Sequence, residues 1–230
     1  MEEHPPSSRT GQKSAPDATD PPFAGDPAWK VERALRDGTI VTIRPITPDD
    51  REALRWGFQH ASAETRYLRF LGAIGELSES VLTYLTCVDQ RDHVALVATL
   101  TTPDLKTERG VGVARFIRLK DAPHVAEAAI TVADDMQKQG VGSALAHEIE
   151  RAAAARGVRV IRAEVLEGNA AMRAILEGAG AQRVDAGDNP GTISYDLTVE
   201  SPRVTSRLAD VLRGAAETMA ISLRKLLPPE

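Results

Sequence analysis

The segment from Gln137 to Gly142 has the residue types and spacing of a phosphate-binding turn. It follows strand-forming residues at 126–133 and leads through two glycines, Gly140 and Gly142, into a helical pattern. The first backbone N–H groups of a helix have no partner inside the helix and lie at its positive end, so they favour an anion. Glycine lets phosphate oxygens approach the backbone because it has no Cβ. The segment therefore predicts a pyrophosphate-binding site.

Two common nucleotide-binding motifs do not fit this segment. A P-loop has a lysine and then a serine or threonine directly after its last glycine, whereas Ser143 and Ala144 follow Gly142. A dinucleotide fold has a third glycine at a position that Leu145 occupies here, and a parallel sheet around the turn. A tight strand-to-helix turn without a ligand remains the alternative for two glycines taken alone.

Composition excludes several other classes of protein. A net charge of -5 and an aromatic share of 4% do not suit nucleic-acid binding, which favours a basic stripe with stacking rings. The five histidines are scattered, with no pair at metal-ligand spacing, and no apolar run approaches the roughly 18 residues that span a bilayer. The single cysteine, Cys87, suits a reducing compartment, and its apolar helical surroundings predict a core residue rather than a nucleophile. We expect a cytoplasmic protein without a metal, a nucleic-acid partner or a membrane span.

Strand and helix patterns around the turn predict a mixed α/β or α+β domain. Period-two segments rich in strand formers predict strands at 39–44, 93–100, 110–119, 124–133, 158–166 and 192–199, the second to fourth forming an antiparallel run. Helical spacing or capping residues predict helices from Thr47 onward and at 62–70, 78–86, 142–156 and 169–178.

The two ends of the chain differ from this central domain, which we place at residues 39–200. Residues 1–30 contain six prolines among Ser, Thr, Asp and Gly, so we expect a disordered tail. Residues 201–230 repeat apolar side chains at helical spacing. They predict an amphipathic helix that packs on its own domain or on a second copy of the chain, which would make a homodimer. A helix on a membrane surface is the alternative, which the acids Asp210 and Glu217 disfavour.

The pattern Gln137-x-x-Gly140-x-Gly142 resembles the R/Q-x-x-G-x-G/A signature of the GNAT N-acetyltransferase superfamily. The resemblance covers residues 39–199 and includes three further features: the opening Arg44-Pro45-Ile46-Thr47-Pro48-Asp49-Asp50, Asn169 after the fifth strand, and Gly180-Ala181 where the family usually has Gly-Phe. Within the superfamily the chain looks most like bacterial protein-lysine acetyltransferases, on the segments 62–70, Asp89-x-x-x-His93, 127–134 and 169–173. The resemblance implies a single GNAT-like domain, whose mixed, mostly antiparallel central sheet is flanked by helices.

The resemblance also implies a reaction, the direct transfer of an acetyl group from acetyl-CoA to an amine, here a lysine of another protein. A lysine must lose its proton before it attacks, which costs roughly 4.6 kcal/mol at pH 7, about 3.4 pKa units at 1.36 kcal/mol each. A general base is therefore valuable, and Glu127 is the natural candidate. In a strand, its side chain shares a face with those of Ala129 and Thr131, an odd setting for a charge unless that face borders a cleft. Partial burial would raise its pKa toward the working range, whereas a glutamate without a role at a strand edge is the alternative.

Residues that would contact acetyl-CoA follow from the same resemblance. The strand backbone at Ala129, Ile130 and Thr131 would pair with the pantetheine arm. Asn169 would hold the arm or a water, or simply cap the helix that it precedes. The remaining contacts would come from the phosphate turn, namely Gln137, Lys138, Gln139, Gly140, Val141 and Gly142.

Two further positions bear on the acceptor. Leu176 stands where many relatives carry a tyrosine that protonates the departing thiolate, which weakens assignment to a small-amine enzyme. His93 either assists the base or is a buried structural histidine. Acetylation of a small amine, or a non-catalytic module that senses acetyl-CoA, remain as alternative functions, and Glu127 favours either enzyme over the sensor.

Overall fold

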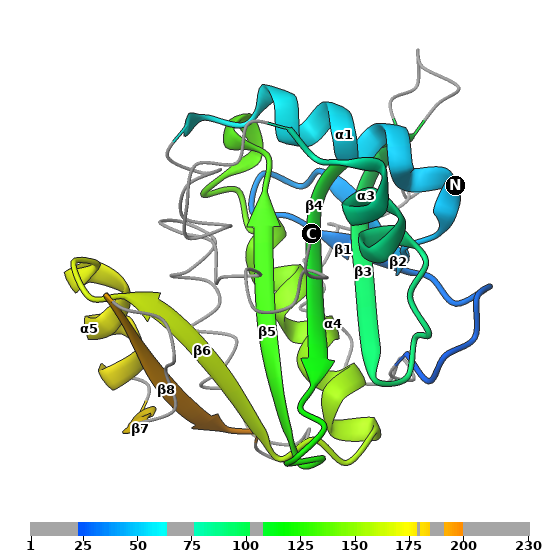
Figure 1. Ribbon diagram of the computed structural model, residues 1–230. Coiled ribbons are helices and arrows are strands. Elements are labelled where there is room, and N and C mark those ends of the chain that lie inside the picture. Colours follow the sequence, from blue (N-terminus) through cyan, green and yellow to red (C-terminus); the bar gives the residue numbers. More distant parts are fainter. Residues whose placement is uncertain (1–22, 64–75, 102–107, 179, 185–190, 200–230) are drawn as a thin grey trace, which may run out of the picture.

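The computed structural model of the protein describes residues 23–63, 76–101, 108–178, 180–184 and 191–199. Within them, eight strands form one sheet in the order β1-β2-β3-β4-β5-β6-β8-β7 (Figure 1). The strands are β1 Val31–Ala34, β2 Ile40–Pro45, β3 His93–Thr101, β4 Glu108–Arg118, β5 Val125–Val132, β6 Val160–Leu166, β7 Gln182–Val184 and β8 Thr192–Thr198. Neighbours in the sheet are antiparallel except β5 and β6, which are parallel. The predicted fold class, with a mixed and mostly antiparallel sheet, is confirmed.

Helices cover both faces of the sheet. Figure 1 shows α1, Arg51–His60, and α3, Glu79–Thr86, on the near face, and α4, Val141–Ala155, on the far face. A 3-10 turn at Pro48–Asp50 precedes α1, and Thr47, from which the sequence predicts a helix, is its N-cap and forms a capping box with Asp50. The last helix, α5, spans Ala170–Gly178, and its Leu176 is buried.

Strand β4 and helix α4 pack very closely against each other. Four apolar side chains recur at helical spacing along α4 and are 0–2% exposed: Val141, Leu145, Ile149 and Ala152. They approach β4 at Gly112, where a Cβ would lie 2.9 Å from Leu145 Cδ1 and 3.2 Å from Val141 Cγ1. A side chain at position 112 would therefore force Leu145 to shift.

The folded part begins earlier than the sequence analysis predicts. Phe23 is fully buried and packs against Trp29, with 5.3 Å between ring centroids, and its carbonyl accepts a hydrogen bond from Arg156 Nη1. β1 then pairs with β2, four residues on each side. The expectation of a disordered tail is therefore wrong for residues 23–30, and residues 1–22 lie outside the described part.

Three other expectations need correction or stay open. Cys87 is exposed, not in the core, because it follows the last residue of α3 as its C-cap. The short strands β1 and β7 were not predicted. Most of the helix predicted at 62–70 and all of the C-terminal helix at 201–230 lie outside the described residues.

Candidate functional site

A split opens in the sheet between β5 and β6. Their register pairs only Val125 with Val160, Ala126 with Ile161, and Glu127 with Arg162. Beyond Glu127 the two strands diverge (Figure 1). Among the residues that the structure describes, no strand pairs with the β6-facing edge of β5 beyond Glu127, so this edge suits a ligand that pairs as a strand does.

The register of β4 and β5 shows which backbone groups face this split. Two hydrogen bonds of 3.0 Å mark the residues that face β4. Leu119 N–H, just after β4, donates to Val125 O, and Ala133 N–H, just after β5, donates to Val111 O. Bonding direction alternates along an antiparallel strand. Even-numbered residues of β5, namely Ala128, Ile130 and Val132, therefore direct their N–H and C=O groups toward the split. Of the three strand residues expected to pair with pantetheine, Ile130 is so oriented, whereas Ala129 and Thr131 face β4.

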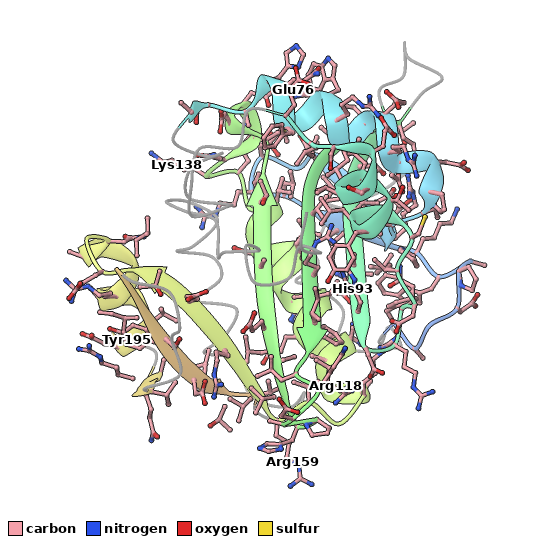
Figure 2. All side chains as sticks on the ribbon, in the orientation of Figure 1. Glu76, His93, Arg118, Lys138, Arg159 and Tyr195 are labelled. Atoms are coloured by element: carbon pink, nitrogen blue, oxygen red, sulfur yellow. The ribbon has the colours of Figure 1, made fainter. Side chains whose placement is uncertain are left out.

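The predicted phosphate turn lies where β5 ends, at the wide end of the split. Figure 2 labels Lys138 there. Lys138 and Gly140 have left-handed backbones, φ 63° and 108°. Gly140 is the N-cap of α4, and the first bond along the helix runs from Ala144 N–H to Gly140 O. The N–H groups of residues 141–143 therefore precede the helical ladder and form its positive end.

Hydrogen bonds hold the turn in this shape. The side chains of Gln137 and Gln139 donate to Asp134 Oδ1 at 3.0 Å and to Asp135 O at 2.8 Å. Gln139 O accepts from Arg36 N–H at 3.2 Å, so the hairpin between β1 and β2 supports the turn. The first turn of α4 contains no acidic residue that would repel an anion. These features fit a pyrophosphate at the N-terminus of α4.

Glu127 lies at the narrow end of the split. It is half-buried and is the last residue of β5 that pairs with β6. Its side chain shares the face of the sheet that α1 and α3 cover, and its carboxylate contributes to a raised pKa at Tyr84, after the larger effect of burial. It also contributes to a raised pKa at Arg162, where the main cause is the hydrogen bond to Asp196. Glu127 and the turn are separated along β5 by about 17 Å, five residues of strand to Val132.

Three polar residues near Glu127 form a cluster that the sequence analysis did not assemble. Tyr84 packs on the ring of His93 at 5.1 Å, and Arg115 Nη1 lies 3.1 Å from His93 Nε2. Since arginine only donates, that nitrogen of His93 accepts and carries no proton. Burial, then the Arg115 charge, lowers the pKa of His93 to about 3. His93, labelled in Figure 2, is thus neutral at pH 7, and Arg115 occupies the lone pair that a base would use.

The remaining predicted site residues lie on the far side of the split. Asn169 directly precedes α5, and its carbonyl accepts from Arg173 N–H at 3.2 Å, which places it at the N-cap position. Leu176 is 1% exposed and contributes to the core. Tyr195, labelled in Figure 2, donates to Glu177 and holds α5 against β8.

Two kinds of feature are missing from the part of the chain that the structure describes. It contains no group of three or more His, Cys, Asp or Glu side chains placed to hold a metal ion. In the same residues, no helix has both the length and the apolar character needed to cross a membrane.

Comparison with known proteins gives consistent matches. A family profile described as "Acetyltransferase (GNAT) domain" matches residues 41–182. Acetyltransferase Pat of Mycolicibacterium smegmatis is 36% identical over 151 residues, 64% of this chain and 43% of that protein. Acetyltransferase PA5475 of Pseudomonas aeruginosa is 35% identical over 140 residues, 61% of this chain and 74% of that protein.

Solved structures agree with these matches. The GNAT domain of S. lividans PAT has a TM-score of 0.64 and 31% identity, and the match covers 74% of this chain and 97% of that one. A cAMP-binding acyltransferase from Mycobacterium smegmatis, solved as a mutant, has a TM-score of 0.50 and 30% identity, with 81% of this chain and 53% of that chain covered. The present chain therefore spans less than half of the Mycolicibacterium Pat and about half of the cAMP-binding protein, and nearly all of the S. lividans domain. The split sheet, the glycine turn and a profile match over more than half of the chain lead to one conclusion. The chain belongs to the GNAT acetyltransferase family.

Proposed function

We propose that this protein transfers an acetyl group from acetyl-CoA directly to a lysine of another protein, with Glu127 as general base. The position of Glu127 supports the proposal most strongly. It is the last residue that joins β5 to β6, so its carboxylate borders the point where the split begins. A thioester held along β5 would place its reacting carbon beside this carboxylate.

The proposed co-substrate would be held at two places. The α4 N-terminus and the turn from Gln137 to Gly142 would bind the pyrophosphate. The backbone of Ala128, Ile130 and Val132 would pair with the pantetheine arm, with Asn169 on the opposite side of the split. A protein-lysine acceptor is supported by the resemblance to bacterial protein-lysine acetyltransferases and by the presence of Leu176 in place of an acidic tyrosine.

The reaction needs little from the protein on the side of the leaving group. The departing thiol has a pKa of roughly 8.5, taking cysteine as its model, so the thiolate leaves without an acid. The amine needs more help, because most lysine is protonated at neutral pH. Glu127 would take a proton from the ammonium group, so that the neutral nitrogen can attack.

A Glu127→Gln variant tests this role. Glutamine keeps the shape of the side chain but cannot act as a base. We expect turnover at pH 7 to fall by roughly two to four orders of magnitude, the usual worth of a general base. The loss should shrink as the pH rises toward 10, because hydroxide then supplies the neutral amine. Transfer of isotopically labelled acetyl to lysate proteins, followed by mass spectrometry, measures this and also identifies the acceptor.

Calorimetry with coenzyme A provides the control. Binding to the variant should stay within a few-fold of binding to the unmodified protein, because the expected contacts are made by the turn and by strand backbone. Unchanged turnover in the variant would reject Glu127 as the base. A protein that binds coenzyme A tightly but transfers nothing would instead support a sensor.

A further inference from the structure

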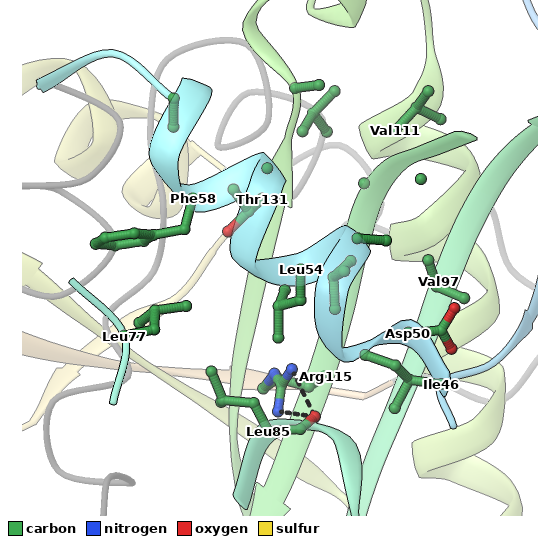
Figure 3. Close-up of a pocket in the computed structure, with 18 residues that line it drawn as sticks. Ile46, Asp50, Leu54, Phe58, Leu77, Leu85, Val97, Val111, Arg115 and Thr131 are labelled. Atoms are coloured by element: carbon green, nitrogen blue, oxygen red, sulfur yellow. Dashed lines mark hydrogen bonds between the residues drawn. The ribbon is translucent and has the colours of Figure 1, made fainter. Parts of the chain in front are cut away.

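A cavity lies between α1 and the sheet, on the face to which Glu127 belongs. Its volume is about 120 Å³, close to the roughly 150 Å³ of an engineered protein cavity that binds benzene. Figure 3 shows α1 passing across the cavity, with Leu54 and Phe58 contributed by the helix and Val97, Arg115 and Thr131 by the strands. Its lining is mainly aliphatic, so a small apolar chain fits it.

Arg115 is one of two charged residues in this lining. Its side chain is 1% exposed, and Nη1 and Nη2 both donate to Leu85 O at 3.3 Å (Figure 3). Its Nε is buried and has no hydrogen-bond partner. Burial lowers the pKa of Arg115 to about 10, so it remains a cation at neutral pH. Among the described residues no carboxylate forms an ion pair with it.

An uncompensated cation in such a place is unfavourable unless an anion joins it. The carbonyl of Leu85, near the C-terminus of α3, supplies only a partial negative charge. The other charged residue of the lining, Asp50, is already neutralised, since its carboxylate accepts from Arg44 Nη2 at 2.8 Å and from Thr47 N–H at 2.8 Å. Of these two charged lining residues, Arg115 is therefore the one that a ligand would satisfy.

A second polar atom faces the same space. Thr131 Oγ1 is buried without a partner, and Thr131 lines the cavity. A buried hydroxyl and a buried guanidinium N–H without partners, on two residues that line an apolar cavity, both suit an oxygen acceptor, and the cation favours an anionic one.

The sheet register connects these atoms to the proposed reaction centre. Arg115 lies directly opposite Ala129, and Val113 directly opposite Thr131. Ala129 is the next residue after Glu127 on this face of β5. Its side chain is small, and the neighbouring side chain across on β4 is the large one of Arg115. Opposed residues have Cβ atoms about 5 Å apart, so the Cβ atoms of Arg115 and Ala129 are neighbours, and Ala129 is two strand residues from Glu127. The cavity meets this face of β5 at Thr131, two residues beyond Ala129.

We propose that this cavity receives the acyl group of the thioester and selects a short acyl chain that ends in a carboxylate, such as succinyl, through Arg115 and Thr131. The inference rests on the proposed acyltransferase function. An acetyl methyl group would end short of Arg115, whereas a carboxylate two methylenes from the thioester carbonyl would extend toward it. The acceptor lysine of another protein is a poor candidate for this cavity, because α1 covers the cavity and a polypeptide needs an open path to reach it.

The bond changes are those of ordinary acyl transfer. The neutral amine nitrogen attacks the thioester carbonyl carbon, the C–N bond forms and the C–S bond breaks. Glu127 has by then taken one proton from the ammonium group, and the second proton that the nitrogen loses on forming the amide passes through water to the departing coenzyme A thiolate. The terminal carboxylate is unchanged throughout.

Four-carbon donors that differ only at the chain end provide the sharpest test. We compare succinyl-CoA with butyryl-CoA, and with acetyl-CoA as reference, using lysine-containing peptides and subtracting the rate without protein. We expect kcat/KM for succinyl-CoA to exceed that for butyryl-CoA at least tenfold. In Arg115→Met, which keeps length but removes the charge, this ratio should fall at least tenfold, and in Thr131→Val by two- to fivefold.

The ratio is measured within each variant, so partial loss of folded protein cancels. A preference for butyryl-CoA in the unmodified protein, or an unchanged ratio in both variants, would overturn the acyl inference while acetyl transfer leaves the proposed function standing. If no donor reacts, the proposed function fails. Calorimetry of succinyl-CoA against butyryl-CoA then decides the inference alone, with equal affinities rejecting it.

Discussion

The two faces of the central sheet differ in how closely they are packed and in whether their buried charges are paired. On the α4 face, β4 approaches the helix so closely that Gly112 has no room for a Cβ. Charges buried on that face are compensated: Glu148 accepts from Arg33 at 2.6 Å and from Arg151 at 3.2 Å. On the α1 face the strands border a cavity, and Arg115 carries a buried N–H without a partner.

Neighbouring residues of one strand therefore have different roles, one in stability and the next in ligand binding. Side chains alternate between faces along a strand, so Ala114 faces α4 while Arg115 faces the cavity. The α4 face anchors the sheet and the turn that opens α4. The α1 face is left with room and unpaired donors. We expect substitutions on the first face to change the free energy of unfolding and those on the second to change ligand preference and pH response.

The largest expected effect comes from Glu148→Ala on the α4 face. Glu148 is fully buried, and its removal leaves Arg33 and Arg151 without its carboxylate. Breaking a buried ion pair from one side costs roughly 3–5 kcal/mol of unfolding free energy. Urea denaturation measures this loss. Glu79→Ala is the matched control, because Glu79 pairs with Arg51 and Arg55 at the surface and such pairs contribute about 0–1 kcal/mol. Equal losses in both variants would contradict the comparison.

A smaller effect is expected from Gly112→Ala, on the same face. The new methyl group would lie 2.9 Å from Leu145 Cδ1 and 3.1 Å from Thr131 O, and overpacking of this kind costs roughly 1–3 kcal/mol. In the same strand, a Cβ at Gly110 meets nothing within 4 Å, so Gly110→Ala should leave stability nearly unchanged. Thermal melting of the two variants distinguishes them, and a stable Gly112→Ala protein would show that α4 is less closely packed than described.

The smallest effect concerns the acid response of the cavity face. The pKa of His93 is about 3 in the folded protein, against an ordinary value of 6.5, because it is buried and faces Arg115, which together outweigh the opposing effect of Asp89. Between these values the unfolded state binds more protons, so the stability that His93 contributes is complete above pH 6.5 and is lost as the pH falls toward 3. The slope is at most about 1.4 kcal/mol per pH unit.

His93→Gln keeps an acceptor for Arg115 and removes this titration. Unfolding free energies measured from pH 6.5 to 5 should therefore depend less steeply on pH in the variant than in the unmodified protein. The pH profile of His147→Gln is compared with that of His93→Gln, because His147 lies on α4 and burial lowers its pKa as well. Parallel pH profiles for His93→Gln and the unmodified protein would argue against a neutral, buried His93.

The sequence predicts those parts of the fold whose signal is local. The glycine turn, the apolar stripe of α4 and the antiparallel run from β3 to β5 each follow from neighbouring residues. β1 escapes prediction because its four residues, Val-Glu-Arg-Ala, read as a polar segment. Its Arg33 is buried and donates a hydrogen bond to Glu148, which lies 115 residues away in the sequence. Phe23 stands among prolines, and only its contacts with Trp29 and Arg156 show that it is buried.

The site divides in the same way. Glu127 could be singled out because a charge stands inside an apolar strand, and Arg115 carries the same signal in Val113-Ala114-Arg115-Phe116. What the sequence does not contain is their common face and the absence of a carboxylate partner for Arg115 among the described residues. Those depend on the register of β4 with β5 and on the position of α3.

The short ladder between β5 and β6 has a further mechanical consequence. β1 to β5 share longer ladders with one another, whereas β6, β7 and β8 join them through three residue pairs, the α4 crossover and backbone bonds from Arg159 and Val160 to His124. Proteins open in cooperative units, and units attached by few contacts open at the lowest free energy. A ligand lying in the split would touch both units and oppose their separation, stabilising the joined state by RT ln(1 + [L]/Kd). The C-terminal half of the sheet is thus expected to exchange its amide hydrogens quickly when alone and slowly when a thioester bridges the two halves.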